Sequence, residues 1–206
     1  MQIVPFLAVA VVIVITPGVD MALITKNALA HGRTAALATA FGVSTGIALW
    51  ALAAAAGLAA VVAASAEAFT VIKLVGAAYL IYLGVQALRS ARRRVPVGAL
   101  RPRQPLRAEI AFRQGFVSNL LNPKIAVFFT SLLPQFVGHG SSPLVGFLVL
   151  GTLFTALGLV WVTAYALAAS RARASLARPR VKAALETLSG VVLIALGLRV
   201  AVERRA

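Results

Sequence analysis

The chain has 206 residues, of which 61% are hydrophobic and only 12% are charged. A soluble globular domain is about half apolar and about a quarter charged, and its interior is too small to bury this much apolar surface. The composition therefore excludes a soluble domain and, by the same numbers, a disordered or collagen-like chain. The net charge of +15 would suggest nucleic-acid binding in a soluble protein, and the lack of cysteine excludes disulfides and thiolate metal sites.

Long stretches with almost no charge divide the chain into segments that suit a membrane. A helix needs about 20 residues to cross the hydrocarbon layer, at about 1.5 Å per residue. The stretch 114–170 holds one charge, Lys124, and is long enough for two crossings separated by a turn-rich cluster at 138–143. The pattern predicts an all-α polytopic membrane protein. Its six expected transmembrane helices are at about 3–30, 36–63, 69–89, 110–137, 143–169 and 182–202.

The positive charges gather in three of the expected connections. Eight arginines fall within 89–113, five basic residues fall within 171–182, and Lys26 and Arg33 lie at the first connection. Six spans place all three on one side, which the positive-inside rule assigns to the cytoplasm, so both termini face outward. The basic C-terminal tail opposes this orientation, which keeps five spans plus a re-entrant segment as the alternative. The cytoplasmic loop at about 90–109 is expected to contact anionic lipid headgroups and not nucleic acid.

The two halves of the chain resemble each other weakly. Thr16-Pro17-Gly18 in the first span corresponds to Asn122-Pro123-Lys124 in the fourth. Each half has three spans, an odd number, so the second copy enters the membrane from the opposite side, as in many secondary transporters. Chance similarity between alanine- and glycine-rich helices is the alternative. The expected organisation is one transmembrane domain, 1–206, with inverted three-helix repeats at about 1–90 and 110–206.

Thr16-Pro17-Gly18 predicts a break in the first span. Proline removes one helical hydrogen bond, glycine adds freedom, and in lipid the freed backbone groups must face protein or a water-filled cavity. The half-helix that begins after the break directs its N-terminal amides at whatever fills the gap, which suits a carboxylate ligand. Asp20 lies just after the break, where it either takes part in function or caps the helix.

A second and more polar break is predicted in the fourth span, at Asn119, Asn122, Pro123 and Lys124. Asn122 is suited to cap the half-helix that starts at Pro123. Lys124 is a cation in apolar sequence, so it needs a carboxylate partner from the substrate or from Asp20. The alternative is that Lys124 extends to a membrane interface.

Other features of the sequence favour packing or exclude other chemistry. Gly42 and Gly46 form a small-residue motif that is expected to serve helix packing. A metal site is disfavoured, because the two histidines are accompanied by no cysteine and no carboxylate cluster. No cofactor is expected. An intramembrane enzyme is disfavoured because the spans hold no serine–histidine pair and no paired carboxylates.

Four sequence blocks follow one another along nearly the whole chain: Thr16-Pro17-Gly18-Val19-Asp20, Lys73-Leu-Val-Gly76, Phe112-Arg113-Gln-Gly115-Phe116 and Asn119-Leu-Leu-Asn122-Pro123-Lys124. Together they resemble the lysine-exporter and homoserine/threonine-exporter superfamily. The resemblance implies an exporter of an amino acid or close derivative in a bacterial inner membrane, exchanging for protons. Relatives usually carry a second proline at position 19 and often asparagine at position 20. The resemblance therefore implies a softer kink here and does not assign an essential proton to Asp20.

The breaks and the resemblance together give one expected mechanism, which is export by alternating access. The substrate carboxylate is expected where the two half-helix N-termini meet, near Thr16, Pro17, Gly18, Asn119, Asn122, Pro123 and Lys124. Lys124 contributes charge to this site, and Asp20 balances Lys124 or carries the coupled proton. The expected partners are an amino acid, protons and anionic lipids, and a homodimer is compatible with the resemblance. A passive channel for small polar solutes, or an exporter of another small metabolite or ion, is the alternative.

Overall fold

The computed structural model describes residues 2–58, 66–92, 106–137, 142–171 and 179–202, and all regular structure in these ranges is helical. The α-helices are α1 (Ile3–Ile15), α2 (Val19–His31), α3 (Arg33–Ala53), α5 (Ala66–Arg92), α6 (Ala108–Leu120), α7 (Pro123–Val127), α8 (Pro143–Arg171) and α10 (Pro179–Val202). Two π-helical turns, η1 (Ala54–Leu58) and η2 (Phe128–Leu132), and a 3-10 turn, η3 (Leu133–Phe136), extend α3 and α7. Most of the expected loop at 90–109 lies outside the described residues.

Membrane-length helices account for most of the described chain. Arg33–Gly57 and α8 are long and apolar enough to cross a membrane individually. The pair α1 and α2, bent by 44°, and the pair α6 and Pro123–Phe136, bent by 47°, pass the same test when each pair is taken together. In α5 and α10 the apolar stretches are shorter, at Leu74–Arg89 and Gly190–Arg199. The protein is thus an all-helical polytopic membrane protein, and its first and fourth helical segments are broken where the sequence predicts.

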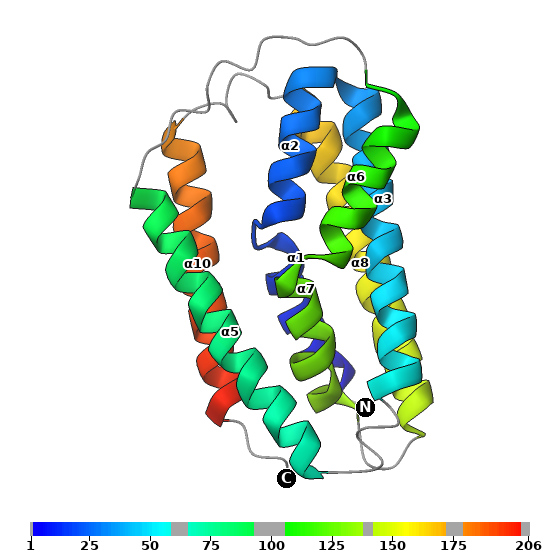
Figure 1. The fold of residues 1–206 in the computed structure, drawn as a ribbon, viewed down its shortest axis with the longest axis vertical. Helices are drawn as coiled ribbons and strands as arrows, with labels where there is room; N and C mark the ends of the chain where they lie inside the picture. Colours follow the sequence, from blue (N-terminus) through cyan, green and yellow to red (C-terminus); the bar gives the residue numbers. More distant parts are fainter. Residues whose placement is uncertain (1, 59–65, 93–105, 138–141, 172–178, 203–206) are drawn as a thin grey trace.

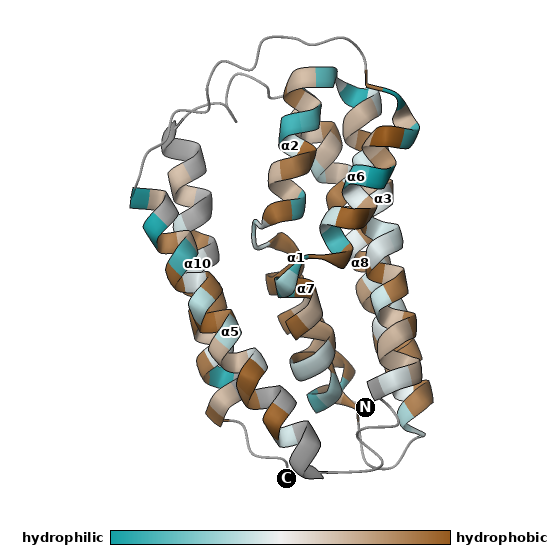
Figure 2. Cartoon of the chain, viewed as in Figure 1, coloured by the Kyte–Doolittle hydropathy of each residue, from teal (hydrophilic) through white to brown (hydrophobic). Residues whose placement is uncertain are grey.

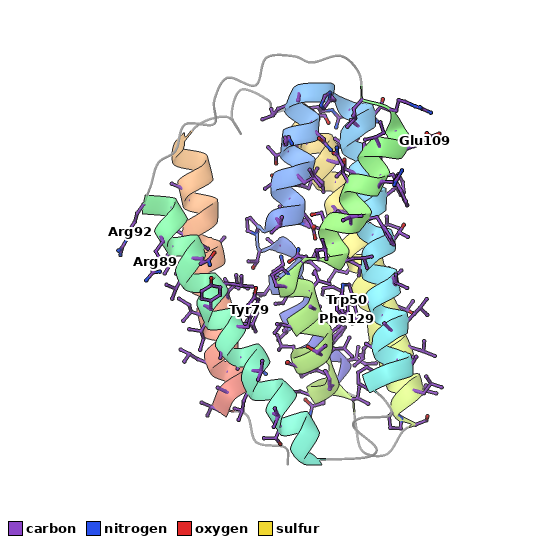
Figure 3. All side chains as sticks on the ribbon, viewed as in Figure 1. Trp50, Tyr79, Arg89, Arg92, Glu109 and Phe129 are labelled. Carbon is purple, nitrogen blue, oxygen red and sulfur yellow. The ribbon has the colours of Figure 1, made fainter. Side chains whose placement is uncertain are left out.

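The starts of the helical segments agree with the sequence prediction to within three residues. Both chain termini lie at one end of the bundle, and α2, α5 and α8 finish at the opposite end, where α3, α6 and α10 begin (Figure 1). Figure 2 shows hydrophilic residues gathered where α2 ends and α3 and α6 begin. Glu109 also lies at this end (Figure 3). The three basic connections therefore leave from the end opposite the termini, which we call the basic end.

Glycines let α3 and α6 approach closely. A Cβ atom at Gly42 would lie 2.0 Å from the Phe112 carbonyl oxygen, and one at Gly46 would lie 2.8 Å from the Asn119 side chain. No larger residue fits either position without separating the two backbones. The predicted packing role of this motif is confirmed, and the contact at Gly46 positions Asn119 beside the break.

A second close crossing joins α5 to α10, which lie side by side apart from the other helices in Figure 1. A Cβ atom at Gly84 would lie 2.7 Å from the Gly190 carbonyl oxygen. The pair contacts the rest of the bundle mainly through α5 and η2, where a Cβ atom at Gly76 would lie 2.1 Å from the Ser131 hydroxyl oxygen. These small residues hold α5 close to α10 and to η2 of the second broken span.

An aromatic cluster fills the core between the breaks and the terminal end of the bundle. It consists of Phe6, Phe128, Phe129, Phe136 and Phe154, which are all at most 2% exposed. The rings of Phe128 and Phe154 stack with centroids 4.0 Å apart. This dry packing closes the half of the molecule that holds the termini.

Candidate functional site

Each break is followed by a half-helix whose first turn carries a charged side chain. Gly18 is the N-cap of α2, and Asp20 is the second residue after it. Asn122 is the N-cap of α7, and Lys124 is again the second residue after it. Asp20 and Lys124 therefore occupy equivalent positions in the two half-helices and carry opposite charges.

The Lys124 ammonium replaces the hydrogen bond that Pro17 removes. A helical residue at position 17 would donate its N–H to the Ile13 carbonyl, but proline has no N–H. Lys124 Nζ donates to the Ile13 carbonyl at 3.2 Å and to the Thr16 carbonyl at 2.7 Å. Because these carbonyls lie at the negative end of the α1 dipole, the ammonium also compensates that partial charge. The Lys124 side chain is buried at the break and does not reach an interface.

The Asp20 carboxylate is bound by the other broken span. The Ser118 hydroxyl donates to Oδ1 at 2.7 Å, and the side-chain amides of Asn119 and Asn122 donate to Oδ2, each at 2.8 Å. Three donors disperse the buried negative charge. No ion pair within 4.0 Å joins Asp20 to Lys124, both of which the structure describes. The two charges therefore share one polar cluster while each is bonded to uncharged partners.

Asn122 connects the two halves of this cluster. Its amide nitrogen donates to Asp20, and its oxygen accepts the backbone N–H of Lys124 at 3.0 Å, which makes it the predicted N-cap. The side-chain oxygen of Asn119 is buried and has no hydrogen-bond partner among the described residues. Thr16 takes part in the site through its backbone carbonyl, which accepts from Lys124. Its hydroxyl donates to the Val12 carbonyl of its own helix and is not part of the site. The structure brings together every predicted site residue: Thr16, Pro17, Gly18, Asp20, Asn119, Asn122, Pro123 and Lys124.

A further polar group extends from the site toward the basic end, and the sequence analysis did not identify it. The buried Asn27 amide donates to the Thr39 hydroxyl at 2.8 Å and to the Gln114 side-chain oxygen at 3.0 Å. Asn27 follows Asp20 by seven residues and Gln114 precedes Ser118 by four, so each pair shares one helix face. This spacing of polar residues within α2 and α6 is the signal that could have revealed the group.

A small cavity adjoins the cluster. Its volume is about 30 Å³, and Gly18, Asp20 and Lys124 form its polar wall. α3 and α8 form the opposite wall with apolar residues that include Ile47 and Val162. Such a volume holds no more than a few water molecules. The site is therefore too small for a free amino acid in this structure, and such a substrate needs the walls to separate.

Two broken membrane helices whose facing half-helix N-termini each bring a charged side chain to one small cavity are typical of a membrane transport protein. The chain belongs to the LysE type translocator family, whose model matches residues 11–204. The protein is therefore a translocator and not an enzyme, and the resemblance noted in its sequence is confirmed.

Relatives cover nearly the whole chain. The chain is 30% identical to a homoserine/homoserine lactone efflux protein of Salmonella typhimurium, over 98% of this chain and 96% of the relative. It is 28% identical to a threonine efflux protein of Salmonella typhi, over 95% of both chains. It is 29% identical to the uncharacterized membrane protein YrhP of Bacillus subtilis, over 94% of this chain and 95% of the relative. No solved structure matches the chain.

The role of Asn122 is testable by its removal. Asn122→Ala deletes the α7 N-cap, at about 1 kcal/mol, and a hydrogen bond to a buried charge, at about 1.5–3 kcal/mol. We expect the melting temperature of the purified protein in detergent to fall by about 5–15 °C. Ser44→Ala is the matched control, because Ser44 is also buried but bonds the Ala40 carbonyl of its own helix. Equal melting temperatures for the two variants would contradict the role assigned to Asn122.

Proposed function

We propose that this protein exports an amino acid or close derivative across the bacterial inner membrane, by alternating access and in exchange for protons. The observation that carries the proposal is the placement of one buried cation and one buried anion, Lys124 and Asp20, at two facing helix breaks beside a single cavity. A zwitterionic amino acid presents the complementary pair of charges. The efflux activities in the names of two relatives support the same substrate class.

The substrate would bind by taking over existing hydrogen bonds. Its carboxylate competes with the Ile13 and Thr16 carbonyls for the Lys124 ammonium, and it also meets the positive N-terminal ends of α2 and α7. Its ammonium competes with the amide and hydroxyl donors around Asp20. These bonds link one broken span to the other, so exchanging them for substrate contacts frees the half-helices to move. Part of the free energy of substrate binding thereby shifts the equilibrium toward the conformation in which the half-helices have moved.

Asp20 is the candidate for the coupled proton. After the substrate leaves, a proton would neutralise the Asp20 carboxylate and leave the site with the one positive charge of Lys124, which the membrane potential would draw inward as the empty site returns. One elementary charge that moves down 100 mV releases about 2.3 kcal/mol, which is enough to drive a neutral zwitterion outward against a gradient. The polar group at Asn27, Thr39 and Gln114 supplies hydrogen-bonding side chains between Asp20 and the basic end.

We further propose six spans arranged as two inverted repeats, with the basic end in the cytoplasm and both termini outside. Three observations support the repeat: the similar bends of the two broken spans, their opposite directions in the bundle, and the equivalent positions of Asp20 and Lys124. The orientation follows from the positive charges at the basic end.

Export assays test the site. Cells that express the protein and are loaded with dipeptides release the amino acids that the protein exports. We expect Lys124→Ala and Asp20→Asn to lower this release at least tenfold, because each leaves one substrate charge without its partner. Lys26→Ala is the control, since Lys26 is an exposed lysine of α2 outside the site. Wild-type release from both site variants would overturn the proposed site. Release that survives collapse of the proton gradient would favour a passive channel.

Cysteine labelling tests the topology, because the chain has no cysteine of its own. Ser142 and Glu109 are both exposed and flank the fourth segment. A membrane-impermeant maleimide is expected to label Ser142→Cys in intact cells and Glu109→Cys only after permeabilisation. The reverse pattern would contradict the orientation. Labelling of both variants from the same side would support a re-entrant fourth segment and contradict six spans.

A further inference from the structure

The two walls of the cavity differ in chemistry. One wall carries the charges of Asp20 and Lys124. The other is formed by apolar side chains, among them Val43, Ile47 and Val162. If the charged wall binds the amino and carboxyl groups of a substrate, as proposed above, the substrate side chain faces the apolar wall.

This apolar wall offers no partner for a hydroxyl group. Among the described residues that line the cavity, none carries a side-chain hydroxyl or amide. α3 and α8 are regular helices here, so their backbone groups are already paired. A substrate hydroxyl would lose its hydrogen bonds to water and gain none in return.

Charge also limits the side chain. Asp20 is the carboxylate among the described lining residues, and the substrate ammonium group would occupy it. The side chain of lysine or arginine would then place a second cation against apolar residues without a partner. The cavity therefore selects against cationic as well as hydroxylated side chains.

Gly158 is the smallest residue on the apolar wall, and only the end of one side chain limits the space beside it. A Cβ atom at Gly158 would meet one neighbour within 4 Å, the terminal methyl carbon of Ile47 at 3.0 Å. That methyl group is the flexible end of a side chain, so this side of the pocket can widen when the site opens. The apolar wall can therefore accept a branched side chain once the end of Ile47 shifts.

We propose that this protein prefers a neutral amino acid with a branched aliphatic side chain, such as valine, over threonine and homoserine. The inference rests on the proposed function and assigns the apolar wall of the same site to the substrate side chain. Valine and threonine have the same shape and differ by a methyl group against a hydroxyl. Apolar pockets discriminate between such isosteres by about 100-fold at most, so a preference of about 10- to 100-fold is expected.

The test uses the full-length protein, purified and reconstituted in liposomes. Exchange of radiolabelled L-valine and of L-threonine is measured for the wild type and two variants. Val162→Thr places a hydroxyl on the apolar wall and is expected to lower the valine-to-threonine ratio about tenfold. Val160→Thr makes the same substitution on the same helix, at a residue that is 69% exposed and outside the cavity, and is expected to leave the ratio unchanged.

The outcomes separate this inference from the proposed function. Threonine exchange equal to or faster than valine exchange in the wild type would overturn the inference and leave the proposed function standing. The same ratio in the Val162→Thr and Val160→Thr proteins would also overturn it. Exchange of lysine but of neither isostere would contradict the inference as well. No exchange of any amino acid would overturn the proposed function and the inference together.

Discussion

The bond from the Lys124 ammonium to the Ile13 and Thr16 carbonyls is the constraint on which the site depends. Pro17 leaves the Ile13 carbonyl without the N–H donor of a regular helix, and inside a membrane bundle such freed carbonyls need a donor from the protein. The Lys124 ammonium, which comes from the second broken span, donates hydrogen bonds to these carbonyls. The second span is in turn held by an anion from the first, because Asp20 binds Asn119 and Asn122. Each break is thus stable only beside the other.

This reciprocal arrangement joins stability to transport. The groups that hold the breaks together are the groups that an amino-acid zwitterion would bind, so a substrate can replace the bonds without leaving a charge unpaired. The glycine crossings at Gly42 and Gly84 join α3 to α6 and α5 to α10 as the frame of the bundle. The aromatic cluster around Phe128 closes one side of the site. Motion is therefore expected at the half-helices, where the polar bonds exchange, and not in the frame.

The sequence predicts the features that local chemistry controls. Charge gaps locate the helices, proline and glycine locate the breaks, and Asn122 before Pro123 predicts the N-cap. The partners of Lys124 could not be predicted in the same way. A carboxylate was expected, whereas the ammonium binds two carbonyls, because the acceptor that Pro17 exposes becomes its neighbour only after two distant segments pack together. The spacing of Asn27 from Asp20 and of Ser118 from Gln114 indicates a shared helix face, but it does not indicate what that face packs against, so the partners of these residues could not be predicted either.

The most direct test of the account is a double-mutant cycle between Pro17 and Lys124, read as the melting temperature of the purified protein in detergent. Pro17→Ala restores an N–H that can bond the Ile13 carbonyl, so the ammonium is no longer needed there. We expect Lys124→Met to lower the melting temperature by several degrees when Pro17 is present and by much less in the Pro17→Ala background. An equal loss in both backgrounds would show that the ammonium does not replace the missing hydrogen bond, and would contradict the account.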